Sequence, residues 1–457
     1  MYSRSIHGRL TMVNIEKKAI FYPNLAGSKA YRIPSMITTS KGTIIAGIDA
    51  RIADHTDNPN EIDVSIRRSE DHGETWGPVQ KLVQYAGEGL NGAAAIDTAL
   101  LEDEETGTLM MIFSHTPGGI GLHASEPGIG FDPVGRRQLY DPNGQLYLLS
   151  ENGTVSDSEG KPTPYFVDRE GYVFHDGEAR GNIYYKRGID PQESLLEART
   201  SFLQMIQSDD DGLTWSEPKE LNLMIKEEWM RFIGSGPGRG IQLKNGEKAG
   251  RLVFPIYFSN EGRHLSCACI YSDDHGVTWK RGHSPNDGRQ WNGEILTAQT
   301  ISDGKQYLTE SQLIELPTGE LTYYMRNHYG LQRTAVASSN DGGETWGEIT
   351  FDMNLVDPIC QSSVIRYPDT GDGKVRLLFS NPNDEDHRVK GTVRLSEDGG
   401  TTWSYSKVIE EEGFGYSCLT VLKNGEIGIL YERVYDSSDW NNMDIQFATF
   451  TLDWLKS

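Results

Sequence analysis

The sequence is poor in cysteine and in clusters of metal-binding side chains. Its 457 residues include four cysteines, too few for the disulfide framework of a small extracellular domain: Cys267, Cys269, Cys360 and Cys418. Cys267 and Cys269 would point to one face of an expected strand, but no second cysteine or histidine pair follows at ligand spacing, so we expect buried structural thiols. The eleven histidines show no His-x-x-x-His or comparable ligand set. We therefore expect neither a catalytic metal nor another cofactor.

Positive charge and long apolar segments are also scarce. The chain has 43 Lys and Arg against 66 Asp and Glu, a formal net charge of −23. Such a field repels nucleic acid and anionic membrane surfaces, so we exclude both as partners. No segment reaches the length of a transmembrane helix, and the N-terminal residues lack the apolar run of a signal peptide. An anionic ligand would require a local concentration of arginine to overcome the field of the whole chain.

Helical patterns are few, whereas turn residues and aromatic residues are abundant. The 50 glycines, 21 tyrosines, 14 phenylalanines and 9 tryptophans suit many short strands joined by tight turns. The chain is long for one domain, but all-β barrels and propellers commonly exceed the usual domain size. A mass of 51.0 kDa is ample to bury a core. We therefore predict an all-β fold with a single unit over residues 1–457.

An octapeptide of the form Ser-x-Asp-x-Gly-x-Thr-Trp is repeated along the chain. Its copies lie at Ser69–Trp76, Ser208–Trp215, Ser272–Trp279, Ser339–Trp346 and Ser396–Trp403. Ser and Asp can bond nearby backbone N–H groups, Gly supplies positive φ, and Trp supplies apolar area beneath the turn, so each copy predicts a β-hairpin turn. The aspartates are expected to accept hydrogen bonds from backbone N–H groups of the turn and not to act as catalytic acids.

The spacing of the copies predicts the number of sheets. Successive copies start 139, 64, 67 and 57 residues apart. Because the first gap is about twice the others, we predict that residues of about 103–199 hold one blade without the octapeptide plus a small inserted β-rich segment. Five blades with the octapeptide and one without it give a six-bladed β-propeller.

The octapeptide resembles the Asp-box of sialidases and related propellers, which include proteins that are not enzymes. A more specific match is Tyr31-Arg32-Ile33-Pro34, which resembles the aromatic-Arg-Ile-Pro signature near the start of bacterial sialidase catalytic domains. Further segments in family order extend the resemblance to about Tyr431-Glu432: His55-Thr56-Asp57, Leu308-Thr309-Glu310-Ser311-Gln312, Tyr324-Met325-Arg326-Asn327, Asp386-His387-Arg388 and Gly415-Tyr416-Ser417-Cys418-Leu419. The chain is identified as a member of the sialidase family on these motifs together.

The resemblance implies a role for each of eight residues. Tyr416 would be the nucleophile, Glu310 its base and Asp57 the general acid/base. Arg32, Arg326 and Arg388 would bind the carboxylate of sialic acid. Arg51 and Asp97 would address the hydroxyl groups of the sugar ring. The implied activity is a retaining exo-α-sialidase acting on sialylated glycoproteins, glycolipids and oligosaccharides. The full-length bacterial form is expected to be secreted or at the cell surface, although a cytoplasmic location stays open.

The chemistry agrees with these residue types. A carboxylate nucleophile would approach the anomeric carbon of sialic acid against the like charge of the substrate, and tyrosine avoids this repulsion. A phenol needs a base because its ordinary pKa is about 10. Arginine presents planar forks that match a carboxylate better than lysine does.

Each residue taken alone also has an interpretation without a function: a solvated arginine, a core tyrosine or a surface carboxylate. Only their joint occurrence in family order outweighs them. A sialoglycan-binding propeller without activity, and an Asp-box hydrolase for other sugars, are the alternatives outside the sialidases. Among sialidases, the same set of residues serves either hydrolysis or intramolecular transfer, which gives 2,7-anhydro sialic acid. Trp440 lies three positions from the spacing expected for a tryptophan that favours transfer, so the sequence does not decide between these products, nor does it predict linkage preference.

One glycine-rich segment could be mistaken for a phosphate-binding loop. Residues 234–240 (GSGPGRG) resemble a phosphate-binding loop, but they lack the Lys-Ser/Thr ending, contain Pro237 and lead into an expected strand at Ile241. The backbone-cradle interpretation therefore fails. We expect a rim loop between blades.

Overall fold

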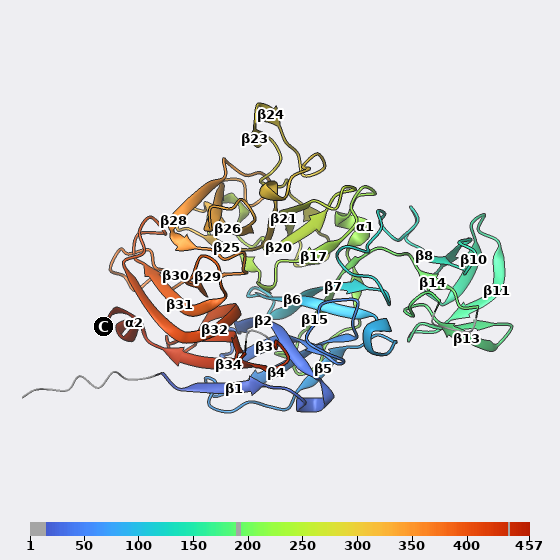
Figure 1. The fold of residues 1–457 in the computed structure, drawn as a ribbon, viewed down its shortest axis with the longest axis horizontal. Coiled ribbons are helices and arrows are strands. Elements are labelled where there is room, and N and C mark those ends of the chain that lie inside the picture. Colours follow the sequence, from blue (N-terminus) through green and yellow to red (C-terminus); the bar gives the residue numbers. More distant parts are fainter. Residues whose placement is uncertain (1–14, 189–192, 437–438) are drawn as a thin grey trace, which may run out of the picture.

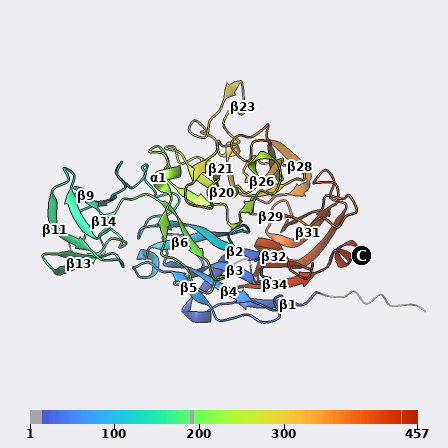
Figure 2. The ribbon, with the colours of Figure 1, turned by 180° about the vertical axis from the view of Figure 1, so that it is seen from behind.

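The computed structural model describes residues 15–188, 193–436 and 439–457, and most of its regular structure is β-strand. The sheets surround a common centre in both ribbon views (Figures 1 and 2), and one further sheet lies to the side. The helices α1 (Asn222–Ile225) and α2 (Leu452–Lys456) are short. The predicted all-β class and β-propeller are confirmed.

The strands around the centre fall into six groups of neighbouring antiparallel strands, which we call blades 1 to 6. Blade 1 contains β2 (Ala30–Thr38), β3 (Ile44–Arg51), β4 (Ile62–Ser69) and β5 (Gln80–Val83). Blade 2 contains β6 (Ala94–Asp103), β7 (Thr108–Thr116), β15 (Phe202–Ser208) and β16 (Lys219–Glu220). Blade 3 contains β17 (Ile233–Ser235), β19 (Ile241–Gln242), β20 (Leu252–Ser259), β21 (Leu265–Ser272) and β22 (Lys280–Arg281).

The remaining three blades complete the circle. Blade 4 contains β25 (Leu308–Glu315), β26 (Leu321–Asn327), β27 (Arg333–Ser339) and β28 (Thr350–Val356). Blade 5 contains β29 (Ser363–Arg366), β30 (Leu377–Pro382), β31 (Val389–Ser396) and the first part of β32 (Tyr405–Val421). The second part of β32 begins blade 6, which continues with β33 (Ile427–Val434), β34 (Met443–Phe450) and the N-terminal strand β1 (Lys17–Phe21).

Blade 6 closes the ring because the two ends of the chain share it. β1 pairs antiparallel with β34, with Lys17 opposite Ala448 and Phe21 opposite Ile445. The blue and red strands accordingly lie side by side in Figure 1. Apolar side chains of adjacent blades fill the space between them; Met110 and Met205 of blade 2, for example, share one buried cluster with Phe254 and Trp279 of blade 3.

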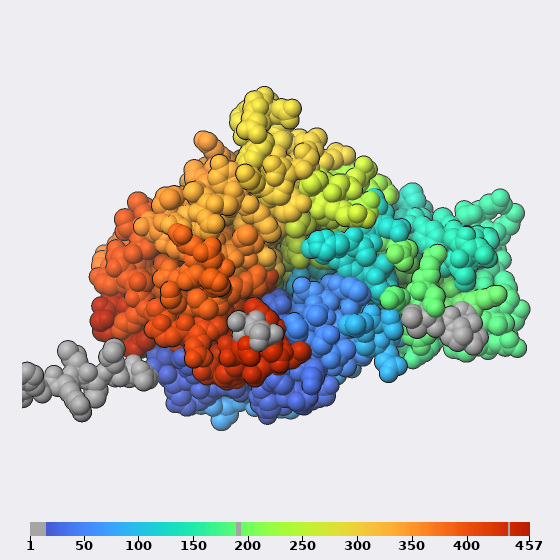
Figure 3. All heavy atoms as spheres, viewed as in Figure 1, coloured from blue at the N-terminus to red at the C-terminus, as the bar shows by residue number. Residues whose placement is uncertain are grey.

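The inserted segment lies between β7 and β15. It forms a seven-stranded sheet of β8 (Arg137–Tyr140), β9 (Leu146–Leu149), β10 (Thr154–Asp157), β11 (Pro162–Val167), β12 (Tyr172–His175), β13 (Glu178–Asn182) and β14 (Leu196–Glu197). A separate small cluster that includes Leu139 and Val173 is its core. The segment stands as a lobe at the edge of the molecule in the space-filling view (Figure 3).

The Asp-boxes make the predicted hairpin turns. In the first copy, Asp71 accepts hydrogen bonds from the N–H of Thr75 (2.9 Å) and from the hydroxyls of Thr75 (2.6 Å) and Ser69 (2.8 Å). Gly73 has φ 88° and donates its N–H to Ser69. The aspartates of the other copies bond their threonines in the same way. Their carboxylates therefore serve the fold.

The position of the unboxed blade differs from the prediction. Each described Asp-box joins the last two strands of one of blades 1 to 5, so the blade without a box is blade 6. The described residues of the range 103–199 hold the second strand of blade 2 and the insertion, and no complete blade. The physical reason is the closure: the third strand of blade 6 is β34 and its fourth is β1, so no hairpin joins them and no turn motif is needed.

Candidate active site

The candidate residues lie at one end of the propeller, where four of the inner strands carry a β-bulge. The register shifts between Arg32 and Ser35 in β2, Ile96 and Ala99 in β6, Leu308 and Ser311 in β25, and Phe414 and Ser417 in β32. A bulge inserts an unpaired residue, bends the strand and redirects side chains. In this structure the bulges turn side chains of blades 1, 2, 4 and 6 towards one cavity, and two bulge residues, Ile33 and Asp97, adopt φ of 61° and 64°.

Tyr416 and Glu310 form the floor of this cavity. The Tyr416 hydroxyl donates to the Glu310 carboxylate, with oxygen–oxygen distances of 2.6 and 2.8 Å. Arg326 donates one N–H to the Tyr416 oxygen at 2.7 Å and also pairs with Glu310. Burial raises the pKa of Tyr416 well above its ordinary value, although the charge of Arg326 opposes this shift. The phenol is therefore neutral, with a carboxylate placed to take its proton.

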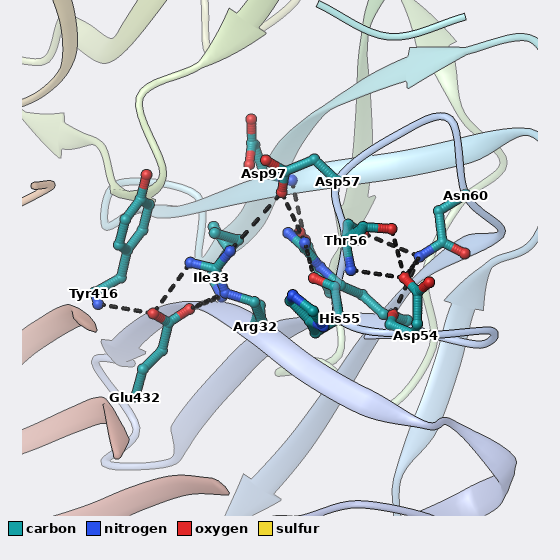
Figure 4. Close-up of polar contacts among 12 residues, drawn as sticks. Arg32, Ile33, Asp54, His55, Thr56, Asp57, Asn60, Asp97, Tyr416 and Glu432 are labelled. Carbon is teal, nitrogen blue, oxygen red and sulfur yellow. Dashed lines mark hydrogen bonds and ion pairs between the residues drawn. The ribbon is translucent and has the colours of Figure 1, made fainter. Parts of the chain in front are cut away.

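A buried glutamate in β33, Glu432, holds Arg32 beside Tyr416. Its carboxylate has no solvent exposure and accepts from Nε (3.1 Å) and Nη2 (3.3 Å) of Arg32. It also accepts the backbone N–H groups of Ile33 (2.9 Å) and Tyr416 (3.0 Å). Figure 4 shows these contacts converging on Glu432. The bulges of β2 and β32 are thus tied to one carboxylate.

Arg388 approaches Tyr416 from blade 5. Its guanidinium carbon lies 5.5 Å from the centre of the Tyr416 ring, the same distance as that of Arg32. It donates to the carbonyl of Ile359 at 2.9 Å. With Arg326 bonded to the Tyr416 hydroxyl, three guanidinium groups from different blades surround this tyrosine. They form a focus of positive charge within an acidic chain.

Asp57 lies in the loop between β3 and β4, on the opposite side of Arg32 from Glu432 in Figure 4. It accepts an N–H from Arg51 at 2.7 Å and lies 3.9 Å from Arg32, and its side chain is 67% exposed. Partial burial would raise the pKa of Asp57, but the charges of Arg51 and Arg32 outweigh it and lower the pKa to about 2. The group is therefore ionised while the arginines beside it are free of ligand.

Arg51 and Asp97 occupy different positions. Asp97 lines the cavity and accepts the hydroxyl of Tyr257 at 3.1 Å. Arg51 is fully buried and lies outside the cavity lining; it bonds Asp49, Asp57 and the His55 carbonyl. Arg51 thus packs beneath Asp57 and positions it, and its contact with the sugar ring stays a prediction.

The cavity has a volume of about 490 Å³ and mixes charge with apolar surface. Arg32, Asp57, Asp97, Glu310, Arg326, Arg388 and Tyr416 all line it. Ile96, Phe232 and Leu265 add an apolar wall. Such a site can bind an anion at the arginines, place a polar ring against both kinds of surface and transfer protons at Tyr416 and Asp57.

The structure thus brings seven of the eight predicted site residues to one cavity, and their catalytic roles stay predictions. Sequence reasoning missed Glu432, Asp49 and Tyr257 as partners of these residues. Glu432 was visible only as the end of the resemblance at Tyr431-Glu432. Within the described ranges no group of three or more metal-ligating side chains occurs, and no helix there is long and apolar enough to cross a membrane.

Known proteins resemble this chain along most of its length. A family model described as a BNR repeat-like domain matches residues 176–429. An anhydrosialidase from Macrobdella decora is 30% identical over 93% of the chain and 61% of its own length, and a sialidase from Micromonospora viridifaciens is 30% identical over 94% and 52%. The chain thus spans about half to three fifths of these two relatives. The intramolecular trans-sialidase from Ruminococcus gnavus is 30% identical in sequence. Its crystal structure matches this one with a TM-score of 0.79, over 96% of this chain and 98% of that chain. This chain belongs to the sialidase family with BNR repeats.

Proposed function

We propose that this protein is an exo-α-sialidase that cleaves terminal sialic acid from glycans through a covalent intermediate on Tyr416. The observation that supports it best is the Tyr416 hydroxyl, hydrogen-bonded to both oxygens of Glu310 within a ring of three arginines. A glycosidase that used a carboxylate nucleophile would need no such neutral hydroxyl at its centre.

The carboxylate that the arginines are proposed to bind gives a reason for a neutral nucleophile. Arg32, Arg326 and Arg388 can bind a carboxylate by charge-assisted hydrogen bonds. A ligand held in this way places a negative charge beside the reacting carbon. A neutral phenol can approach that carbon without repulsion, and Glu310 removes its proton as the bond forms.

Asp57 is proposed to protonate the leaving oxygen and then to deprotonate the attacking nucleophile. With a pKa of about 2 it is ionised before a ligand binds. A carboxylate bound at the arginines would cancel part of the positive charge that lowers this pKa. Substrate binding is therefore the event that prepares Asp57 to carry a proton.

Tyr416→Phe tests the nucleophile. It keeps the ring, which packs with Ile33 and Cys360, and removes the hydroxyl. We expect turnover of an activated aryl sialoside to be lost while thermal stability and sialic acid binding are retained. Near-normal turnover by a folded Tyr416→Phe variant would exclude Tyr416 as nucleophile.

A second candidate is intramolecular transfer, in which the glycerol side chain of the substrate replaces water and 2,7-anhydro sialic acid is released. The Trp440 ring lies 5.2 Å from the guanidinium carbon of Arg32 and 6.0 Å from that of Arg388. The indole is not part of the cavity lining, but it lies beside two of the arginines proposed to bind the carboxylate, and we propose that it limits access of water there and so favours attack from within the substrate. Two of the similar proteins are named an anhydrosialidase and an intramolecular trans-sialidase.

Mass spectrometry of the product distinguishes the two candidates, because the anhydro sugar is lighter than free sialic acid by one water. Trp440→Ala should shift the product towards free sialic acid while the sugar is still released. Free sialic acid as the sole product of the unaltered protein would exclude intramolecular transfer and leave hydrolysis.

A further inference from the structure

A second cavity, of about 170 Å³, lies at the opposite ends of the inner strands. Glu310 in the first cavity is near the start of β25, whereas Ile314 and Glu315 at its end line the second. Five residues of strand separate Glu310 from Glu315, which is roughly 16 Å at the usual rise per residue. The second cavity is therefore distinct from the candidate active site, and its properties do not depend on the proposed function.

Two arginines line this cavity, and the described part of the chain offers neither of them an ion-pair partner. Arg239 belongs to the short strand β18 (Gly238–Arg239), which pairs parallel with β6. Its Nε is buried without a hydrogen-bond partner among the described residues. Arg366, the last residue of β29, donates to the backbone carbonyl of Glu315 at 3.3 Å. Both guanidinium groups thus have donors left over.

The carboxylates of the same cavity are already satisfied elsewhere. Glu104 pairs with Nζ of Lys244 at 2.8 Å. Glu315 accepts the N–H groups of Lys244 (2.8 Å) and Asn245 (2.9 Å) and the Asn245 amide (3.0 Å). Neither side-chain carboxylate is bonded to Arg239 or Arg366, although the chain carries 66 acidic residues against 43 basic ones.

The segment around Arg239 is the glycine-rich stretch at residues 234–240. Its backbone is committed to the fold, since Gly236 donates its N–H to Pro255 and Gly240 to Leu100, both at carbonyl oxygens. It therefore offers no backbone cradle for a phosphate, as the sequence indicates. It also lines the centre instead of the rim, because β18 lies against β2 and β6.

A buried guanidinium N–H without a hydrogen-bond acceptor is costly, so a protein normally pairs it. Nε of Arg239 is such a group, and the partly buried Arg366 lines the same small cavity, where a single anion with several acceptor oxygens can bond both planar forks. We propose that this cavity is a binding site for a small oxyanion of the phosphate or sulfate class, held by Arg239 and Arg366. Bound there, the anion links the inner strand of blade 5 to β18 at the centre.

Thermal unfolding in phosphate and in chloride at matched ionic strength tests the site. The arginines of the first cavity also attract phosphate, so the readout is the difference between variants. We expect phosphate at roughly 100 times its dissociation constant to raise Tm through this site by about 3 °C, a contribution that Arg239→Gln and Arg366→Gln each lose. The matched control is Arg169→Gln, which removes one exposed arginine of the inserted segment and should keep the full response.

Crystals soaked in selenate give an independent readout through anomalous scattering. We expect a selenium peak between Arg239 and Arg366 in the unaltered protein and in Arg169→Gln. This measurement also decides the matter if Arg239→Gln fails to fold, because it needs no variant. Equal phosphate responses in all folded variants, or selenium peaks elsewhere with none in this cavity, would overturn the proposal.

Discussion

Replacing Glu432 by glutamine tests how the site holds Arg32 and Tyr416 together. The buried carboxylate accepts four hydrogen bonds, two from Arg32 and one each from the backbone of Ile33 and Tyr416. Glutamine offers one oxygen and no charge, so the Arg32 guanidinium loses its buried counter-charge. Removing one partner of a buried ion pair typically costs about 3–5 kcal/mol. With an unfolding entropy of about 2.1 cal/mol/K per residue, this corresponds for the whole chain to a fall in Tm of about 3–5 °C.

The effect should depend on pH in a defined direction. Burial would raise the pKa of Glu432, but Arg32 and the two backbone donors lower it below its ordinary value. A lowered pKa contributes stability that is present above the unfolded value of about 4.3 and is lost as the pH falls through the folded value. The difference in Tm between the two proteins should therefore be constant from about pH 5 to 7 and shrink below about pH 4.

Differential scanning calorimetry across this range, with kcat/KM at neutral pH, provides the measurement. Glu412→Gln is the matched control, because Glu412 is exposed on β32 and should leave both quantities unchanged. We expect Glu432→Gln also to lower kcat/KM, since Arg32 and the Tyr416 bulge lose their common support. An unchanged Tm together with unchanged kcat/KM would refute the view that this carboxylate positions the site.

Three further substitutions examine the proposed roles. Asp57→Ala should reduce kcat/KM on natural glycosides by about 10²–10⁴ and far less on sialosides with a good leaving group, and equal losses on both would remove Asp57 from the acid role. Arg51→Gln removes the nearest positive charge from Asp57, so the pKa of Asp57 should rise and the alkaline limb of the pH–rate profile should move to higher pH; an unmoved limb in a variant with normal melting would contradict this. Arg388→Lys should lower kcat/KM for the free acid about tenfold or more, because an ammonium lacks the fork. The unaltered protein should barely cleave the methyl ester of the same sialoside, and comparable rates on acid and ester would argue against carboxylate binding by the arginines.

The features that the sequence predicted correctly are mainly local. Each Asp-box contains its own donors and acceptors within eight residues, so the turn and the fate of Asp71 follow from the motif alone. The location of the unboxed blade was wrong because ring closure pairs β1 with β34, strands from opposite ends of the chain. Counting turns along a sequence does not reveal which blade lacks a hairpin.

The site shows the same division. The motifs around Arg32 and Tyr416 identified residues that meet at one cavity. Glu432, which supports both of them, lies 400 residues after Arg32 and 16 residues after Tyr416 in the sequence. Burial of Arg51 beneath Asp57 likewise depends on how β3 packs against the following loop. Neither the β-bulges that aim the side chains nor the lack of an ion-pair partner for Arg239 in the described part of the chain has a local signal in the sequence. They arise from packing between blades.

Trapping the glycosyl–enzyme tests the central claim most directly. A 2,3-difluorosialic acid reacts by loss of the anomeric fluoride, and the second fluorine slows breakdown of the resulting bond to the protein. Intact mass spectrometry should show the addition of one fluorosialosyl group, and peptide mapping should place it on Tyr416. The Tyr416→Phe variant should remain unlabelled, whereas Glu412→Gln should label fully. A label on Glu310, Asp57 or any other residue, or equal labelling of Tyr416→Phe, would contradict the account.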